Sequence, residues 1–243
     1  MTTPHELAQQ LEANPILPKG TEERFNGYGL MGMPFSSGHV LALRRFTASS
    51  IGNGYTSVWH RSPNKIWTFY ADTDPQHSCT RYFGRMATQA IVTPISINWL
   101  SDFSFEVTVE SAQLHWFVKV AATPVTKAMN VLGTVLPQSA WKNELVLNLM
   151  SKVASAALGV QRVGLSGTVP NGQHFIANPK SIWAVTESYA TLAGTDLGTP
   201  TPLHQQASLQ DFWIPQKGIL AFGQAYFEVF DTNRHSAITH KAA

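Results

Sequence analysis

Titratable side chains are concentrated in one stretch of the chain, YADTDPQHSCTRYFGR, at residues 70–85. The stretch follows a run of aromatic and β-branched residues and continues into turn-forming ones, so we expect it to pass from a strand into a loop. Catalytic groups often lie at such strand ends, because the strand holds them at the mouth of a cavity. The candidates are Asp72, Asp74, His77, Cys79, Arg81 and Tyr82. A simpler interpretation stays open, in which Asp72 and Asp74 cap a turn and Cys79 fills the core.

A hairpin is predicted for GYTSVWHRSPNKIWTFYAD, residues 54–72, with its turn at Ser62-Pro63-Asn64. The expected register places Trp59 opposite Trp67, so that one face is an aromatic slab. We expect this face to pack against protein.

The other face of the hairpin carries His60, Tyr70 and Asp72 among apolar neighbours. In an apolar cavity, burial shifts the pKa values of such groups toward those needed for general acid–base chemistry. We therefore predict that these three side chains are catalytic and face a cavity. The alternative is a histidine whose ring is satisfied by a backbone carbonyl in a packed core.

A second hairpin is predicted from the alternation in FSFEVTVE and LHWFVKVAA. It places Thr108 opposite His115 and Ser104 opposite Lys119, with Glu106 on the same face. Burial lowers the pKa of a lysine, and a buried Lys119 in this row could form a Schiff base. The alternative is that this row is the solvated outer face of a half-buried strand.

Further polar and aromatic side chains on predicted strands and loops are candidates for contacting a substrate. We predict this role for Asp74, His77, Tyr82, Trp99, His115, Lys119, Trp183 and Tyr226.

The fold expected around these residues is mostly β, an antiparallel barrel or paired sheets with a helical insertion at about 125–158. About ten strand-like runs follow one another at hairpin distances, which favours antiparallel pairing. In the insertion, Pro137 separates two helical patterns, Ser139 is the expected N-cap of the second, and Gly159 its C-terminal stop. A short helix is also predicted at 5–13.

We predict a single β-rich domain over residues 1–243, because no repeat or low-complexity linker divides the chain. Residues 1–37 are expected to be an N-terminal lead-in, and residues 232–243 a flexible tail.

Composition excludes several classes of function. The net charge is +2 without a run of basic residues, which argues against nucleic-acid binding. A single cysteine, Cys79, excludes a disulfide framework and a multi-cysteine zinc site. No nucleotide-binding motif or metal-binding histidine motif occurs, so no cofactor and no metal are expected. The chain also lacks a signal peptide and a transmembrane segment, so we expect a cytoplasmic location.

The pattern of residues 38–230 resembles the lipocalin-like group, which includes carotenoid hydratases, AttH-type proteins and Diels–Alderases. The resemblance rests on TSVWHRSPNKIWTFYAD, SIWAVTES, a PNG turn and the closing AFGQAYFEVF. It implies β-barrel-like lobes that bind apolar molecules, although the helical insertion departs from that pattern.

The acetoacetate decarboxylase-like fold is a second resemblance, since it is also β-rich and of similar length. That family uses a Schiff-base lysine in a GFPK-type segment, whereas this chain has GMPFSS at residues 32–37. Lys119 would have to take the role of the lysine.

The sequence therefore predicts a cofactor-free enzyme, of the lyase, isomerase or cyclase type, acting on a small or medium hydrophobic molecule by hydration, dehydration, isomerisation or cyclisation. The first alternative is a non-catalytic carrier of a lipid, terpenoid or polyketide. The second is a Schiff-base enzyme using Lys119. A homodimer is compatible with each.

Overall fold

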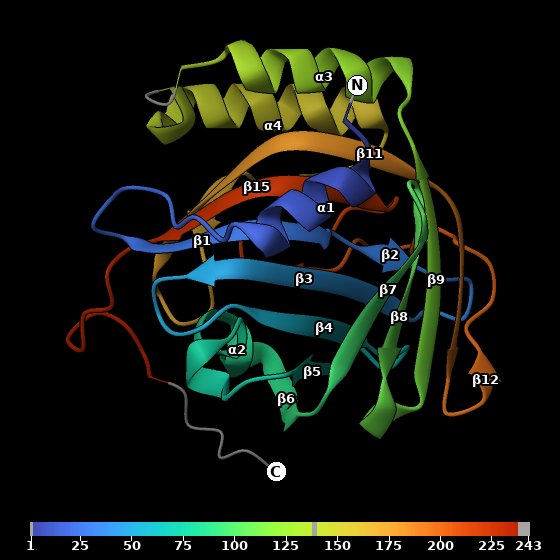
Figure 1. The fold of residues 1–243 in the computed structure, drawn as a ribbon. Coiled ribbons are helices and arrows are strands. Elements are labelled where there is room, and N and C mark those ends of the chain that lie inside the picture. Colours follow the sequence, from blue (N-terminus) through green and yellow to red (C-terminus); the bar gives the residue numbers. More distant parts are fainter. Residues whose placement is uncertain (1, 138–139, 238–243) are drawn as a thin grey trace.

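A curled β-sheet forms the centre of the molecule in the computed structural model, which describes residues 2–137 and 140–237 (Figure 1). Ten strands make its main path, in the order β6-β5-β4-β3-β1-β15-β11-β9-β8-β7. Their bounds are β1 Glu23–Leu30, β3 Val40–Ser49, β4 Tyr55–Arg61, β5 Trp67–Ala71, β6 Ala87–Val92, β7 Ile95–Ser101, β8 Ser104–Val109, β9 Leu114–Ala121, β11 His174–Leu192 and β15 Ile219–Phe227. Neighbours on this path are antiparallel, apart from the parallel pair β5–β6. The mostly β fold is thus confirmed, as a half-barrel.

Shorter elements lie around this sheet. The short strands are β2 Met33–Pro34, β10 Ser166–Thr168, β12 Thr195–Asp196, β13 Ser208–Leu209 and β14 Phe212–Trp213. The helices are α1 Pro4–Ala13, α2 Thr80–Phe83, α3 Pro124–Val135 and α4 Glu144–Leu158. Single 3₁₀ turns are η1 Pro75–His77, η2 Gly84–Met86, η3 Glu110–Ala112 and η4 Ala140–Lys142. Helices α3 and α4 lie side by side over β11, whereas α2 lies near β5 and β6 (Figure 1).

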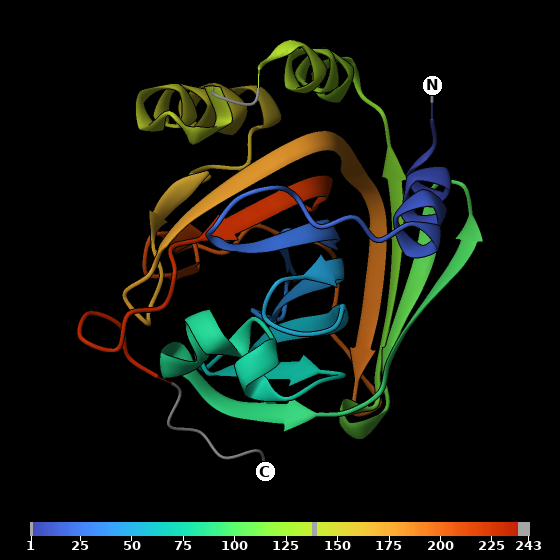
Figure 2. The ribbon, with the colours of Figure 1, turned by 60° about the vertical axis from the view of Figure 1, so that its left-hand side comes forward.

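The curl of the sheet depends on β11, a strand of 19 residues. Its first half pairs with β15 and its second half with β9. The register shifts between Pro179 and Ser181 and again between Val185 and Glu187, and such irregularities bend a strand. Figure 2 shows the result, with β11 turning from beneath the helices into the wall formed by β7, β8 and β9.

Two hydrophobic cores lie on opposite faces of the curled sheet. The first core fills the space between β7–β9 and the strands β1 and β3–β5, and includes Phe105, Trp116, Trp183 and Phe222. The second core covers the other face of β1 and β3–β5, where α2 and β14 pack. Its large side chains include Phe25, Trp59, Trp67, Phe69, Tyr82, Phe83, Phe175 and Phe227, with Phe212 packed against them. Successive side chains along a strand point to opposite faces of the sheet, so neighbouring residues of these strands belong to different cores.

The two predicted hairpins both exist. In β8–β9, Thr108 pairs with His115 and Ser104 with Lys119, as predicted. In β4–β5, Trp59 pairs with Phe69 rather than with Trp67, a slip of two residues from the predicted register. A slip of two keeps every side chain on its predicted face, because the side-chain period of a strand is two.

The helical insertion is confirmed. Thr123 caps α3 through a capping box with Thr126, and Pro124 occupies the first turn. Asn143 caps α4 by accepting hydrogen bonds from two backbone N–H groups, and Gly159 ends it in the left-handed conformation, as predicted. The N-cap predicted at Ser139 lies outside the described residues.

The chain ends differ from expectation. The predicted lead-in of residues 1–37 contains β1, which lies in the middle of the sheet between β3 and β15. Its glycines and asparagine are residue types that are common in loops, so its sequence does not indicate a strand. Within the predicted tail, the Ser236 N–H donates to the Asn171 carbonyl (2.8 Å), so residues up to this point pack on the domain. Residues 238–243 lie outside the described part.

No helix in the described ranges is both long enough and apolar enough to cross a lipid bilayer.

Candidate functional site

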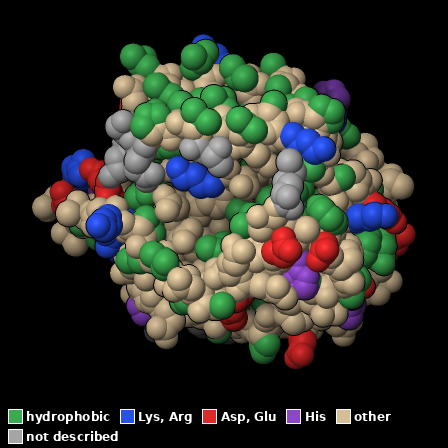
Figure 3. Space-filling model, turned by 45° about the horizontal axis from the view of Figure 1, so that its top comes forward, with side chains coloured by type: hydrophobic (Ala, Val, Ile, Leu, Met, Phe, Trp, Pro, Cys, Tyr) green, Lys and Arg blue, Asp and Glu red, His purple; other side chains and the backbone are tan. Residues whose placement is uncertain are grey.

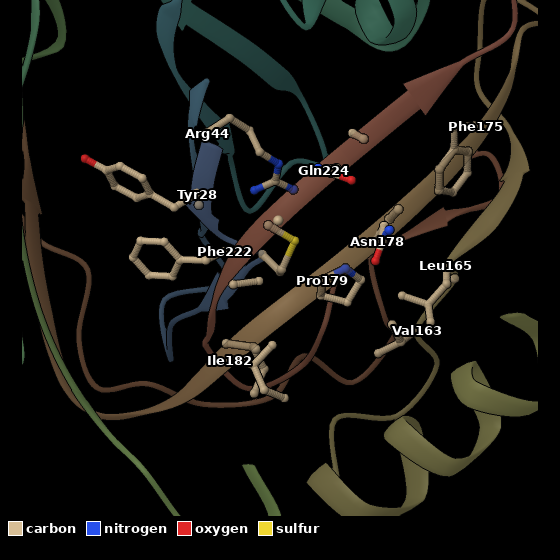
Figure 4. Close-up of a pocket in the computed structure, with 18 of the residues that line it drawn as sticks. Tyr28, Arg44, Val163, Leu165, Phe175, Asn178, Pro179, Ile182, Phe222 and Gln224 are labelled. Atoms are coloured by element: carbon tan, nitrogen blue, oxygen red, sulfur yellow. The ribbon is translucent and has the colours of Figure 1, made fainter. Parts of the chain in front are cut away.

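The main cavity lies under α3 and α4, on the face of the sheet that carries the second core. It encloses about 180 Å³ and is bounded by β1, β3, β4, β11 and β15, both helices, α2 and β14. Its walls are largely aromatic and aliphatic, with contributions from Phe46, Trp59, Phe83, Met129, Trp141, Met150, Phe175, Ile182, Phe212 and Trp213. Figure 4 shows that Arg44 projects from the strand side into this largely apolar surround.

The floor of the main cavity is built from residues without large side chains. On the adjacent strands β1 and β15, Gly27 pairs with Gly223 and Gly29 with Ala221. A Cβ atom on Gly27 would lie 2.0 Å from the Arg45 carbonyl oxygen, and one on Gly223 would lie 2.2 Å from the Asn178 oxygen. The strands approach so closely here that only glycine fits, and the absence of side chains leaves space above the floor.

Arg44 is the charged group at the centre of this site. It stands on β3 and is only 4% exposed. Its Nη1 donates to the carbonyls of Leu30 (2.9 Å) and Leu43 (2.7 Å), whereas its Nη2 is buried without a hydrogen-bond partner in the described structure. No Asp or Glu forms an ion pair with it within residues 2–137 and 140–237. Arg44 is thus a buried cation without a counter-ion there.

Burial determines the electrostatics around Arg44. It lowers the pKa of the guanidinium from 12.5 to about 10, which still leaves the group protonated at neutral pH. Tyr55 and Cys79 lie nearby, their hydroxyl and thiol 3.2 Å apart, and burial raises the pKa of both. These two groups are therefore neutral and do not balance the charge of Arg44.

Other polar atoms in the walls also lack partners. The indole N–H groups of Trp141 and Trp213 and both amide atoms of Asn178 are buried without hydrogen bonds in the part of the chain described. Buried polar groups of native proteins are nearly always hydrogen-bonded, so each group left unpaired calls for an explanation. Lys180 lies close by, with its Nζ 5.0 Å from the centroid of the Trp141 ring, and burial lowers its pKa.

Tyr82 lines the main cavity, as does Cys79 among the other candidates predicted from the sequence. Its hydroxyl donates to Glu23 (2.6 Å), which also accepts from Arg81 and from Gln173. Burial alone would raise the pKa of Glu23, but the hydrogen bonds from Arg81, Tyr82 and Gln173 lower it overall. The network fixes the Tyr82 ring against Phe227 and so shapes the wall.

The predicted catalytic residues lie on the opposite face of β4 and β5. His60 and Tyr70 are buried and Asp72 is exposed. His60 Nε2 lies 2.7 Å from His39 Nδ1, and Asp72 accepts a hydrogen bond from the Thr56 N–H (2.8 Å). The prediction that the Trp59 face packs against protein is confirmed, since Trp59 and Trp67 are buried in the second core. Trp59 also lines the main cavity, whereas the side chains of His60, Tyr70 and Asp72 do not line it in the described structure.

Asp72 and Trp99 border a different hollow, at the surface beneath α1. Asp74 caps the turn η1 by accepting from Gln76 N–H (2.8 Å), as the simpler interpretation expects. His77, next to it, is exposed.

The remaining candidates are distributed over the sheet. His115 is exposed on β9, as is Lys119, whose Nζ lies 3.6 Å from Glu187. Trp183 is buried in the first core. The buried Tyr226 donates to Gln224 (2.8 Å). None of these four lines the main cavity in the described structure.

Sequence reasoning missed Arg44. The signal was present in HVLALRRFTAS, where Val40, Ala42 and Phe46 share one strand face and Arg44 interrupts it. Two consecutive arginines cannot both face solvent on a strand, because successive side chains point to opposite faces. Arg45 is the one that faces outward, where it forms a bidentate pair with Glu12.

Comparisons with solved structures give a distant similarity. No protein-family model and no curated protein matches the sequence. The crystal structure of acetoacetate decarboxylase from Legionella pneumophila subsp. pneumophila str. Philadelphia 1 is similar, with a TM-score of 0.41 and 11% sequence identity, over 92% of this chain and 89% of that chain. Similarity at this level does not establish a shared activity. The neighbour belongs to the second of the two groups that the sequence resembles, and the lipocalin-like resemblance stays a prediction.

Proposed function

We propose that the main cavity binds an apolar molecule with an anionic end, such as a long-chain carboxylic acid, and that Arg44 supplies the counter-charge. The observation that carries this proposal is the buried guanidinium whose Nη2 has no partner in the described structure. A buried charge without a counter-ion costs several kcal/mol, roughly 3–5 when a partner has been removed. A carboxylate oxygen at Nη2 would offset that cost through a charge-assisted hydrogen bond.

The walls favour the apolar part of such a ligand. Aromatic rings and the thioethers of Met129 and Met150 surround the site, and methionines adapt to ligands of varied shape. Apolar area removed from water stabilises binding by roughly 25 cal/mol per Å². The walls would thus provide affinity, and Arg44 the selection for an acid over a neutral analogue.

A matched pair of ligands tests this proposal. Titration calorimetry with a long-chain carboxylic acid and with the alcohol of the same chain should show the acid binding at least about tenfold more tightly. Arg44→Met should remove this preference. Arg162→Met is the control, because Arg162 also stacks on a tryptophan, 4.5 Å from the Trp213 ring, but is exposed. Equal affinities of the wild-type protein for acid and alcohol would disprove the role of Arg44.

A cofactor-free enzyme is the second candidate. The observation that favours it is the pair His39–His60, whose ring nitrogens Nδ1 and Nε2 lie 2.7 Å apart, and burial lowers the pKa of His60 to about 4 and keeps its ring neutral. Catalytic roles for His60, Tyr70 and Asp72 stay predictions. Asp72→Asn distinguishes the candidates, because an enzyme would lose turnover with little change in affinity, whereas a carrier has no turnover to lose.

The Schiff-base alternative has less support from the geometry. Lys119 is exposed and its Nζ lies 3.6 Å from Glu187, so it lacks the buried apolar pocket in which Schiff-base lysines lie. Borohydride trapping with a small β-keto acid would test it directly.

A further inference from the structure

We propose that the outer face of α3 and α4 docks onto an anionic lipid bilayer, and that the ligand reaches the main cavity from that surface. The proposal rests on the proposed function and adds the source of the ligand. The docking face is defined by Val131, Leu132, Val135, Leu145, Leu149 and Val153.

The first support is the concentration of exposed apolar side chains on the two helices. Six of the fourteen large hydrophobic residues that are exposed among the described ones belong to the docking face, with exposures from 45% for Leu132 to 80% for Leu145. Leu145, Leu149 and Val153 follow at intervals of four, so they form one stripe along α4. Figure 3 shows hydrophobic side chains, in green, gathered on the upper side of the molecule, where the helices lie in Figure 1. Contiguous apolar surface of this kind marks an interaction site.

The second support is that the same helices are apolar on their inner side. Met129 of α3 and Met150, Ala154 and Leu158 of α4 line the main cavity. A helix that packs on a protein core is normally polar on its outer face, and one that is apolar all round is surrounded by apolar material. The main cavity lies on the inner side of α3 and α4, so a lipid bilayer on their outer side would give these helices apolar surroundings on both sides.

The third support is continuity between the docking face and the cavity. Leu132 lines the main cavity and is also 45% exposed. Leu132 therefore belongs both to the wall of the main cavity and to the docking face, so the two surfaces are continuous at this side chain. This arrangement spares the ligand a passage through water.

The fourth support is the sign of the charge around the docking face. Residues 124–158 contain three lysines and a single glutamate. Lys127 and Lys152 are exposed on α3 and α4, and Lys217 reaches the end of α4 at Gly159. Basic residues beside an apolar helical face are typical of helices that lie in the interface of an anionic membrane. The charge therefore favours a bilayer with acidic headgroups over a neutral one.

Vesicle flotation with the full chain tests the proposal. Vesicles of phosphatidylcholine with phosphatidylglycerol should retain the wild-type protein, and vesicles of phosphatidylcholine alone should retain at least about tenfold less. The triple variant Leu145→Ser/Leu149→Ser/Val153→Ser should lose at least about tenfold in retention. The control is Ile16→Ser/Val92→Ser/Val229→Ser, which removes the same number of exposed apolar groups outside the docking face and should behave as wild type.

Acid binding in vesicle-free solution separates this proposal from the proposed function. Both triple variants should bind a long-chain acid as the wild type does, which also shows that they fold. If the acid binds but anionic vesicles do not retain the wild-type protein, the docking is overturned and the proposed function stands. Sedimentation that shows a wild-type dimer, dissociated by the triple variant on α4, would also overturn it, because a second copy would then cover the docking face.

Discussion

The guanidinium carbon of Arg44 lies 4.6 Å from the centroid of the Trp59 ring, and 5.6 Å from that of Phe212. Ring faces attract a cation, and such contacts contribute about 2 kcal/mol or more when they are desolvated. They hold the guanidinium in place without occupying its hydrogen-bond donors. Arg44 is therefore oriented before a ligand arrives, and its Nη2 stays free to donate.

Replacing this arginine should separate stability from binding. In Arg44→Met the buried charge disappears while the apolar volume is largely kept, so the free energy of unfolding should stay equal or rise by about 1–3 kcal/mol. Urea denaturation followed by tryptophan fluorescence measures this. A loss of stability together with a loss of acid binding would mean that the arginine serves the fold rather than a ligand.

Adding a methyl group to the cavity floor should be strongly destabilising. Gly27→Ala places its Cβ 2.0 Å from the Arg45 carbonyl oxygen, so the strands must separate, and we expect a loss of about 3 kcal/mol or more. Thermal denaturation would show it. Gly52→Ala is the control, since its nearest neighbour is a His77 side-chain atom at 3.3 Å on the surface, and should change stability by less than about 1 kcal/mol.

Lowering the pH should destabilise the fold through the buried histidine His60. Desolvation, with the nearby His39 as a smaller cause, lowers the pKa of His60 to about 4, so the folded state favours the neutral ring. Above pH 6.5 the ring is neutral in both the folded and the unfolded chain, and its full contribution to stability is present. As the pH falls from 6.5 through 4, the unfolded chain takes up the proton first, so the free energy of unfolding decreases by up to about 3 kcal/mol.

Comparison of variants isolates this effect from the titration of carboxylates. The stability of His60→Gln should fall less steeply than that of the wild type between pH 6.5 and 4 in urea unfolding. Replacing an exposed histidine, in His204→Gln, should leave the wild-type slope unchanged. Parallel slopes for all three proteins would show that His60 is not held neutral by the fold.

The single thiol should be inert in the folded protein. Cys79 is buried, and burial raises its pKa although Tyr55 and Arg44 act in the other direction. Because the thiolate is the reactive form, a disulfide reagent at pH 8 should modify it only at the rate of unfolding. Rapid stoichiometric labelling of the native protein would contradict the burial.

Much of the fold follows from local pattern. The alternation of FSFEVTVE and LHWFVKVAA fixed the pairing of Thr108 with His115, because each strand has one clearly apolar face. The hairpin around Pro63 slipped by two residues, since Lys65 adopts a positive φ of 66° and belongs to the turn instead of the strand. Gly159 was recognisable as a helix stop for the same local reason.

The site depended on contacts that no local pattern contains. Both faces of β4 are buried and mix apolar with polar residues, so its sequence does not say which face meets a cavity and which meets the first core. That is decided by the bend in β11, which closes one side with β7–β9, and by α3 and α4, which leave space on the other. Side-chain chemistry alone points to His60 and Tyr70, whereas the informative departure from the pattern is the position of Arg44 on an apolar strand face.

The paired glycines Gly27 and Gly223 also restrict how this site can change during evolution. Their backbone floor has no side chains to exchange, and it does not tolerate new ones. Under the proposed function, selectivity for longer, shorter or bulkier ligands would therefore be tuned from the helical side, at positions such as Met129 and Met150. Helices on a loop-connected insertion accept such exchanges without disturbing strand pairing, so the same half-barrel could serve a series of related proteins with different ligands.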